Sequence, residues 1–186
     1  MTYEAYRDAL LKIALEQGCS DAEVYARESQ EFSVEVMEQT IDSYSVSRAL
    51  GLSIRVCLDG KNGYAYTELL EEPEALVARA MDNARAIEST DEHPMQGASQ
   101  YPAVQLPENP LTNMDDAARI QLAMELEKKA LAGDERCVRV AGNQVIWEQG
   151  SIHIANTRGL QASRDVTAAV CFVEPVLQGQ RMAAPC

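Results

Sequence analysis

The sequence contains few of the side chains that most often perform chemistry in proteins. It has two histidines, and its aromatic residues make up only 5% of the chain. His93 lies in the segment Asp91–Pro94, which offers oxygen and nitrogen ligands. A structural zinc site needs about four ligands and a catalytic one about three plus water, and no HExxH or HExxxH pattern occurs here. We therefore interpret His93 as a solvated histidine and predict no metal site and no bound cofactor in this chain.

Motifs for nucleophilic or phosphate chemistry are also missing, because no GxSxG, Walker or GxGxxG sequence is present. Cys57, Cys137 and Cys171 lie in strand-like patterns, where cysteine usually behaves as a small buried hydrophobic residue. His153 alternates with two isoleucines, which predicts an exposed or cross-strand-paired side chain. The sequence thus predicts no catalytic and no cofactor-binding residue.

Positive charge is scarce. The formal net charge is −13, and Lys128-Lys129 is the only place where two basic residues are adjacent. Such a field repels phosphate backbones and anionic membrane surfaces, so we expect no direct nucleic-acid partner and no membrane partner. Charged residues are spread through Tyr3–Gln17, whereas a signal peptide has an uncharged apolar core. The five cysteines form no CxxC motif. These features favour a cytoplasmic protein with reduced thiols.

What the sequence does contain is a regular pattern of helices and strands over 186 residues. Helical periodicity with cap or stop residues predicts three helices. The first is Tyr3–Gln17, capped by Thr2 and stopped by Gly18, and the second runs from Pro73 to near Ser89. The third is capped by Thr112 or Asn113 and ends at Gly133. We expect the third helix to bury a face made of these residues: Ala117, Ile120, Met124 and Leu131.

The clearest strand signal is Gly51–Thr67, where apolar side chains alternate from Leu52 to Leu58. Asp59–Gly63 then predicts a hairpin loop, and a return strand passes through Tyr64 and Tyr66. Other segments have strand patterns: Ala22–Arg27, Phe32–Val36, Ile41–Ser47, Cys137–Val140, Val145–Trp147, Ile152–Ile154, Leu160–Ala162 and Thr167–Val173. Because several strands follow one another without helices, we predict an α+β fold, with antiparallel sheet built from hairpins and about three packed helices.

Proline-rich residues 90–112 divide the pattern into a helix-and-strand unit at 1–89, a linker or long loop at 90–112, and a second such unit at 113–186. Asp21–Val24 is similar to Asp134–Cys137, which suggests internal duplication. Chance repetition of a common α+β order explains it equally well.

Asn156–Gly159 is the most individual short motif and predicts a hairpin turn, because asparagine and glycine tolerate positive φ. A functional alternative is that Arg158 binds a peptide carboxylate.

Several of these segments, in their order and spacing, resemble the N-terminal region of the TldD/PmbA family, described as modulators of DNA gyrase and as metallopeptidases. The matching segments are Gly18–Val24 after the first helix, Val34–Ser47, Gly51–Val56, Asp59–Ala65 and Ile152–Leu160. The resemblance extends to about Val173, and residues 179–186 depart from it. It favours the PmbA-type subunit slightly.

The resemblance implies that this chain is a non-catalytic, N-terminal part of a subunit, ending before the catalytic half. Family members carry their zinc ligands, an HExxxH helix and a cysteine, in the C-terminal half of the TldD-type subunit. No ligand can therefore be assigned to any residue of this chain. The implied role is to shape a peptide cavity and to contact a second subunit in a homodimer or heterodimer, with peptide as the substrate of proteolysis.

Two alternatives remain open at the level of sequence. One is a stand-alone binding or scaffold module without peptidase activity, and the other is a modulator of DNA gyrase that acts through protein contact. The sequence leaves the substrate, the oligomeric state and the presence of HExxxH in the complete protein undetermined.

Overall fold

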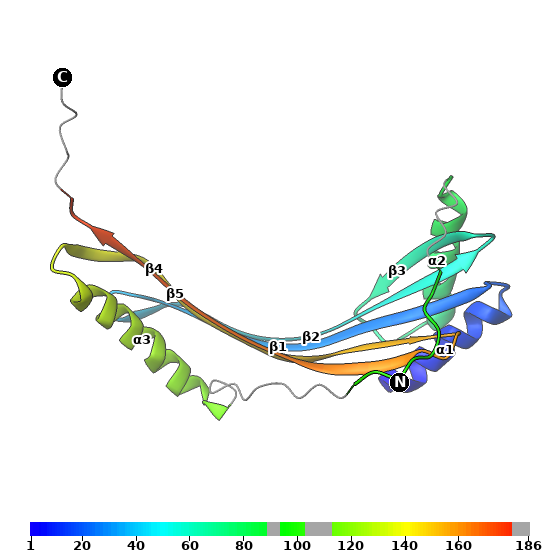
Figure 1. The fold of residues 1–186 in the computed structure, drawn as a ribbon, viewed down its shortest axis with the longest axis horizontal. Helices are drawn as coiled ribbons and strands as arrows, with labels where there is room; N and C mark the ends of the chain where they lie inside the picture. The colour runs from blue at the N-terminus through cyan, green and yellow to red at the C-terminus, as the bar shows by residue number, and fades with distance from the viewer. Residues whose placement is uncertain (89–93, 103–112, 180–186) are drawn as a thin grey trace, which may run out of the picture. The chain divides into compact units, whose positions relative to one another are not determined.

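The computed structural model describes residues 1–88, 94–102 and 113–179. Within them the order of elements is α1 (Tyr3–Glu16), β1 (Asp21–Met37), β2 (Thr40–Leu58), β3 (Lys61–Thr67), α2 (Pro73–Ala86), α3 (Asp116–Gly133), β4 (Cys137–Asn156) and β5 (Gln161–Leu177) (Figure 1). The strands form a five-stranded sheet in the order β3-β2-β1-β4-β5. The predicted α+β fold with three helices and an antiparallel sheet is confirmed. No helix in the described part of the chain is long and apolar enough to cross a membrane.

The predicted strands were too short. Ala22–Arg27 and Phe32–Val36 are parts of the single strand β1, and the patterns at Ile41–Ser47 and Gly51–Leu58 are both parts of β2. The intervening residues, 28–31 in β1 and 48–50 in β2, looked like breaks because they do not continue the alternation of apolar and polar side chains, and in the structure none of them is fully buried. Extended backbone can continue through such residues when neighbouring strands supply its hydrogen bonds.

Residue contacts divide the chain into two compact units that share β1, β2, β4 and β5. Unit 1 consists of 1–29, 48–105 and 150–166, and unit 2 of 30–47, 106–149 and 167–186. The predicted division into 1–89 and 113–186 remains a prediction, as does the internal duplication. Of the predicted linker, residues 90–93 and 103–112, with His93 among them, lie outside the described residues.

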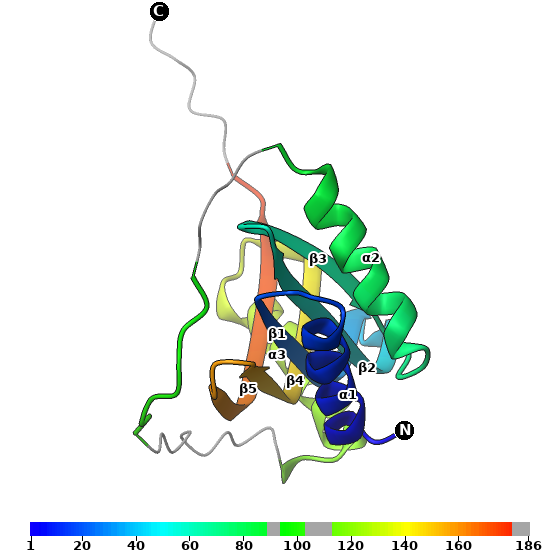
Figure 2. The same cartoon turned by 90° about the vertical axis from the view of Figure 1, so that its right-hand side faces the viewer.

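Unit 1 packs α1 and α2 against the sheet, and Figure 2 shows the two helices beside each other with α2 along β3. Thr2 caps α1 by accepting a hydrogen bond from the Ala5 amide, and Gly18 follows the helix with a φ of 92°, as predicted. The core of this unit is aliphatic apart from one tyrosine and two sulfur-containing residues: Tyr6, Leu10, Ala14, Cys19, Ala22, Val24, Ala26, Leu52, Ile54, Val56, Leu76, Val77, Ala80 and Met81.

The β2–β3 hairpin was predicted with a loop that is too long. The turn is Asp59–Gly60, both at positive φ, and β3 begins at Lys61. Gly63, placed by the sequence in the loop, is a strand residue that faces α2. A Cβ there would collide with the Ala80 carbonyl oxygen and the Ala84 amide nitrogen, so this glycine allows the helix to approach the strand.

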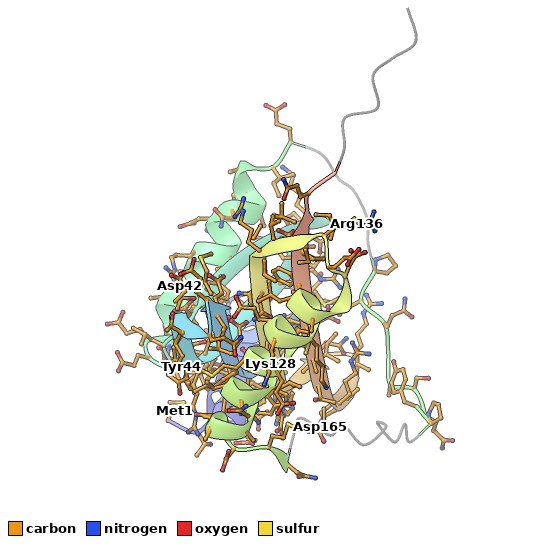
Figure 3. All side chains as sticks on the ribbon, turned by 90° about the vertical axis from the view of Figure 1, so that its left-hand side faces the viewer. Met1, Asp42, Tyr44, Lys128, Arg136 and Asp165 are labelled. Atoms are coloured by element: carbon orange, nitrogen blue, oxygen red, sulfur yellow. The ribbon has the colours of Figure 1, made fainter. Side chains whose placement is uncertain are left out.

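Unit 2 packs one helix, α3, against its part of the sheet. Asp115 caps this helix by accepting a hydrogen bond from the Ala118 amide at 2.7 Å, so the predicted caps at Thr112 or Asn113 were wrong. The core contains these residues: Phe32, Val34, Val36, Ala123, Val145 and Trp147. Lys128 lies on the exposed side of α3 (Figure 3).

The predicted face of α3 was right in part, since Ile120 and Met124 are half-buried and pack against the core of this unit. The fully buried residues of the helix are Arg119, Ala123 and Glu127, whereas Ala117 and Leu131 are exposed. The i, i+4, i+8 spacing of the buried residues is helical. Sequence reasoning placed the charged members outside because arginine and glutamate are rarely buried unless they are paired.

Candidate functional site

The turn Asn156–Gly159 in unit 1 joins β4 to β5, as predicted. Gly159 has a φ of 84°, and the Asn156 side-chain oxygen accepts hydrogen bonds from the amides of Arg158 at 3.0 Å and Leu160 at 3.1 Å. The asparagine side chain therefore supplies an acceptor for two backbone amides of the turn.

Arg158 binds a carboxylate of this chain. Its Nε donates to Asp21 Oδ1 at 2.8 Å and its Nη2 to Asp21 Oδ2 at 2.7 Å, which is a bidentate pair. The hydrogen bonds from Arg158 are the main reason that the pKa of Asp21 is lowered. The alternative in which Arg158 holds a peptide carboxylate conflicts with this geometry, because Asp21 occupies the Nε–Nη2 edge of the guanidinium and Nη1 donates to the Met95 carbonyl at 3.3 Å.

Further polar contacts extend from this turn through unit 1. Asn156 Nδ2 donates to Glu23 Oε2 at 3.0 Å and to the Gln96 carbonyl at 2.8 Å. Glu23 in turn pairs with Arg55 of β2 at 3.2 Å, with both side chains largely buried. The network connects three strands and the segment near Gln96. Arg55 Nε is buried without a hydrogen-bond partner among the described residues, but the other contacts join the strands, so the evident role of the network is structural.

Unit 2 holds two buried charged side chains that the sequence did not identify as such. The Arg119 guanidinium lies 4.0 Å from the centroid of the Trp147 ring and 5.3 Å from that of Phe32, and it pairs with Asp116 at 2.9 Å. Glu127 accepts hydrogen bonds from the amides of Glu38 and Gln39, both at 2.8 Å. These two side chains join α3 to the sheet within this unit.

The cysteines and His153 depart in part from the predictions. Cys57 and Cys137 are half-buried and Cys171 is exposed, so the expectation of buried residues was wrong for Cys171. His153 is half-buried, with its ring centroid 5.2 Å from that of Tyr3 and its Nε2 2.9 Å from Ser151 Oγ. It is not exposed, because Tyr3 of α1 lies against it, and its pairing across strands stays a prediction.

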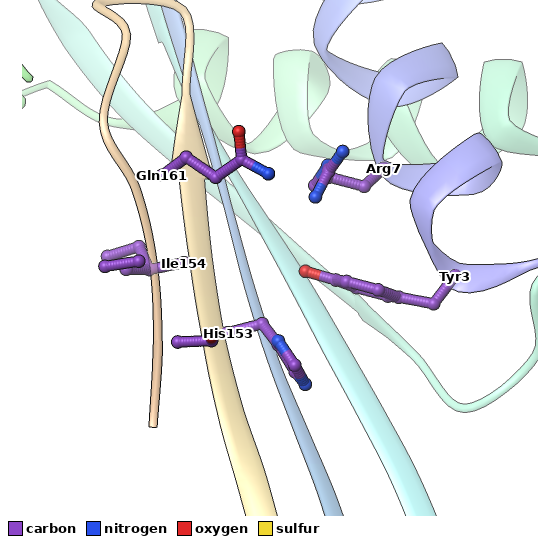
Figure 4. A pocket seen from close by; sticks show the side chains of 7 residues that line it. Tyr3, Arg7, His153, Ile154 and Gln161 are labelled. Atoms are coloured by element: carbon purple, nitrogen blue, oxygen red, sulfur yellow. The ribbon is translucent and has the colours of Figure 1, made fainter. Parts of the chain in front are cut away.

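A cavity of about 130 Å³ in unit 1 opens beside His153. It is lined by Tyr3 and Arg7 of α1, by His153 and Ile154 of β4, and by Gln161–Ser163 of β5. Figure 4 shows the hydroxyl of Tyr3 and the side chains of Arg7 and Gln161 pointing toward the same space.

Within the described ranges, no group of three or more His, Cys, Asp and Glu side chains is arranged to hold a metal ion. The expectation that this chain contributes no catalytic, cofactor-binding or metal-ligating residue stays a prediction.

Comparison with known proteins gives two matches to family models. Residues 22–84 match PmbA/TldA metallopeptidase domain 1, and residues 109–184 match the PmbA/TldA metallopeptidase central domain. The uncharacterized protein MJ0231 of Methanocaldococcus jannaschii is 34% identical over 76 residues, which cover 41% of this chain and 18% of that protein.

Three solved structures share the fold. A candidate modulator of a DNA gyrase from Thermotoga maritima has a TM-score of 0.83 at 23% identity, covering 95% of this chain and 40% of that one. TldE from Thermococcus kodakarensis has a TM-score of 0.80 at 20% identity, covering 97% and 41%. A candidate modulator of DNA gyrase from Bacteroides thetaiotaomicron has a TM-score of 0.81 at 20% identity, covering 97% and 42%.

The chain thus spans about two fifths of the length of the solved structures that it matches. The two family models follow each other in order and together account for most of the chain. On this evidence the chain belongs to the PmbA/TldD family, whose first and central metallopeptidase domains it contains.

Proposed function

We propose that residues 1–186 form a non-catalytic, N-terminal part of a TldD/PmbA-type metallopeptidase subunit, and that they shape the peptide cavity and contact a second subunit. The observation that carries this proposal is the consecutive match to the first and central domains of the family. The absence of an HExxxH sequence from the chain agrees with it.

Strand β5 supports the part of the proposal that concerns a second subunit. It is an edge strand, and its residues Thr167–Val173 form a run without charge, in which Val170 and Phe172 are 50% and 42% exposed. Long apolar edge strands favour pairing with another chain. The other edge strand, β3, has seven residues and is packed by α2. We therefore assign the subunit contact to β5.

The catalytic part of the proposal is tested by metal analysis and peptide digestion with purified chain 1–186. We expect far less than one zinc per chain and no cleavage of an unfolded peptide above the blank. About one tightly held zinc per chain, or cleavage that a chelator abolishes, would contradict a non-catalytic role.

The subunit contact is tested by sedimentation of the same chain over a range of concentrations. We expect association that Phe172→Ser weakens at least tenfold, because the substitution removes an exposed aromatic side chain from the proposed contact. Tyr64→Ser, which removes a 52% exposed aromatic residue from β3, is the matched control and should have no effect. A chain that stays monomeric, or equal effects of the two variants, would contradict the assignment to β5.

A further inference from the structure

The cavity beside α1 has a lining that is unusual for this chain. The protein has 29 aspartates and glutamates, yet none of them lines the cavity. Five of the seven lining side chains can donate a hydrogen bond: Tyr3, Arg7, His153, Gln161 and Ser163. A space surrounded by donors and without carboxylates suits an anionic group.

Arg7 is held in position at the edge of this space. Its Nε donates to Asp8 Oδ1 at 2.8 Å and its Nη2 lies 2.7 Å from the same oxygen, while the Arg7 side chain is only 14% exposed. The Asp8 contact involves Nε and Nη2 but not Nη1. The guanidinium is therefore ordered before any ligand arrives, and it retains a donor for one.

The Tyr3 hydroxyl lacks an acceptor. Its oxygen is buried and has no hydrogen-bond partner among the described residues. Burial has the largest effect on the pKa of Tyr3 and raises it overall. The Arg7 guanidinium lies beside the phenol and lowers the pKa by a smaller amount, but the two groups are outside hydrogen-bond geometry. The phenol thus stays protonated at neutral pH and can donate. A buried donor without an acceptor is unfavourable, and an anionic oxygen in the cavity would remove this deficit.

The charge of the site favours a monoanion. The Arg7 guanidinium is the only permanent positive charge in the lining, and Asp8 already balances part of it. The net charge of −13 also disfavours a dianion more than a monoanion. A planar carboxylate also matches the planar donors of arginine. The volume of about 130 Å³ accommodates several water molecules, and hence one carboxylate group.

We propose that the cavity formed by Tyr3, Arg7, His153 and Gln161 binds a carboxylate, supplied either by a small organic acid or by the C-terminus of a peptide. Arg7 and Tyr3 donate to its oxygens, and Gln161 supplies a further donor from β5. This site lies within unit 1 and does not depend on the proposed function.

The test is an NMR titration of chain 1–186 at constant ionic strength with four probes: acetate, N-acetyl-Ala-Ala, its C-terminal amide and inorganic phosphate. We expect saturable shifts of amide signals around Tyr3, Arg7 and Gln161 with both carboxylates, and at least tenfold weaker binding of the amide. If acetate and the dipeptide bind with equal affinity, the source of the carboxylate is a small acid. If the dipeptide binds more tightly than acetate, the source is a peptide C-terminus. No saturable shift, an amide that binds as well as the acid, or phosphate that binds more tightly would overturn the proposal.

Variants test the assignment of the donors. Arg7→Gln should weaken carboxylate binding at least tenfold and Tyr3→Phe about threefold to tenfold, since each removes one donor. Arg85→Gln is the matched control, because Arg85 is also a helix residue of unit 1 paired to a nearby aspartate, Asp82. Equal weakening by Arg85→Gln would overturn the assignment. If Arg7→Gln proves unstable on thermal unfolding, Tyr3→Phe and Gln161→Ala test the same contacts, and unchanged affinity in both would overturn the proposal.

Discussion

Two of the hairpin turns, the one between β1 and β2 and the one between β2 and β3, adopt similar backbone conformations for different reasons. In unit 1 the turn residues Asp59 and Gly60 have φ values of 51° and 76°, and both residue types are common at such positions. In unit 2 the turn residues Glu38 and Gln39 have φ values of 51° and 59°, although neither type favours them. There the buried carboxylate of Glu127 accepts hydrogen bonds from both turn amides. A turn can therefore be specified by its own residues or by a distant side chain.

The largest effect is expected from removing the distant side chain. Glu127→Leu should lower the free energy of unfolding by about 3 kcal/mol, because hydrogen bonds to a charged group are lost and the turn amides lose their acceptor. Urea unfolding measures the change. Glu125→Leu, at an exposed position of the same helix, is the control and should change stability little. A similar loss in both variants would contradict the role given to Glu127.

A rescue experiment sharpens the comparison. In the Glu127→Leu background, the double substitution Glu38→Asn with Gln39→Gly should recover about 1–2 kcal/mol, because it introduces residues that tolerate positive φ. Urea unfolding of the single and triple variants measures the recovery. If stability is not recovered, the loss does not arise from the conformation of the turn.

The unit 1 turn should respond to substitution at its own residues. Gly60→Ala should cost about 1 kcal/mol, because the added Cβ meets no atom within 4 Å and only the positive φ opposes it. Thermal unfolding measures this change against Gly133→Ala, where a Cβ also meets no atom and φ is not positive. Equal outcomes for the two variants would show that the positive φ of Gly60 is not needed.

The smallest effect is expected at the partly exposed pair of Asp21 and Arg158. Because the pKa of Asp21 is lowered from its usual 3.8 in the folded chain, its ionised form stabilises the fold above that pH. The contribution is lost as the pH falls through the lower, folded value. Asp21→Asn should therefore reduce stability slightly at pH 7 and have progressively less effect below pH 3.8. The measurement is urea unfolding of both proteins from pH 7 to pH 2.5, and an effect independent of pH would contradict the ion pair.

Much of the local structure could be predicted from the sequence, since its signals lie within a few residues of one another. The Thr2 cap and Gly18 bound α1, Pro73 begins α2, and Asn156–Gly159 forms a turn. The same local reasoning was only partly right for α3. Ile120 and Met124 of the expected apolar face pack against the core, but the most buried positions also include Arg119 and Glu127. Their burial depends on partners that local patterns do not identify: the Phe32 and Trp147 rings for Arg119, and the turn at Glu38 for Glu127.

The sequence by itself therefore determined the α+β class, the starts of α1 and α2, the position of the β2–β3 hairpin and the resemblance to the PmbA/TldD family. Only the tertiary structure decided the Glu38–Gln39 turn and the donor-lined cavity between α1, β4 and β5. Tyr3 and Arg7 are separated from Gln161 by more than 150 residues, and Glu127 lies 88 residues from Gln39. The cost of burying such polar groups is offset only when the folded chain brings their partners within hydrogen-bond distance.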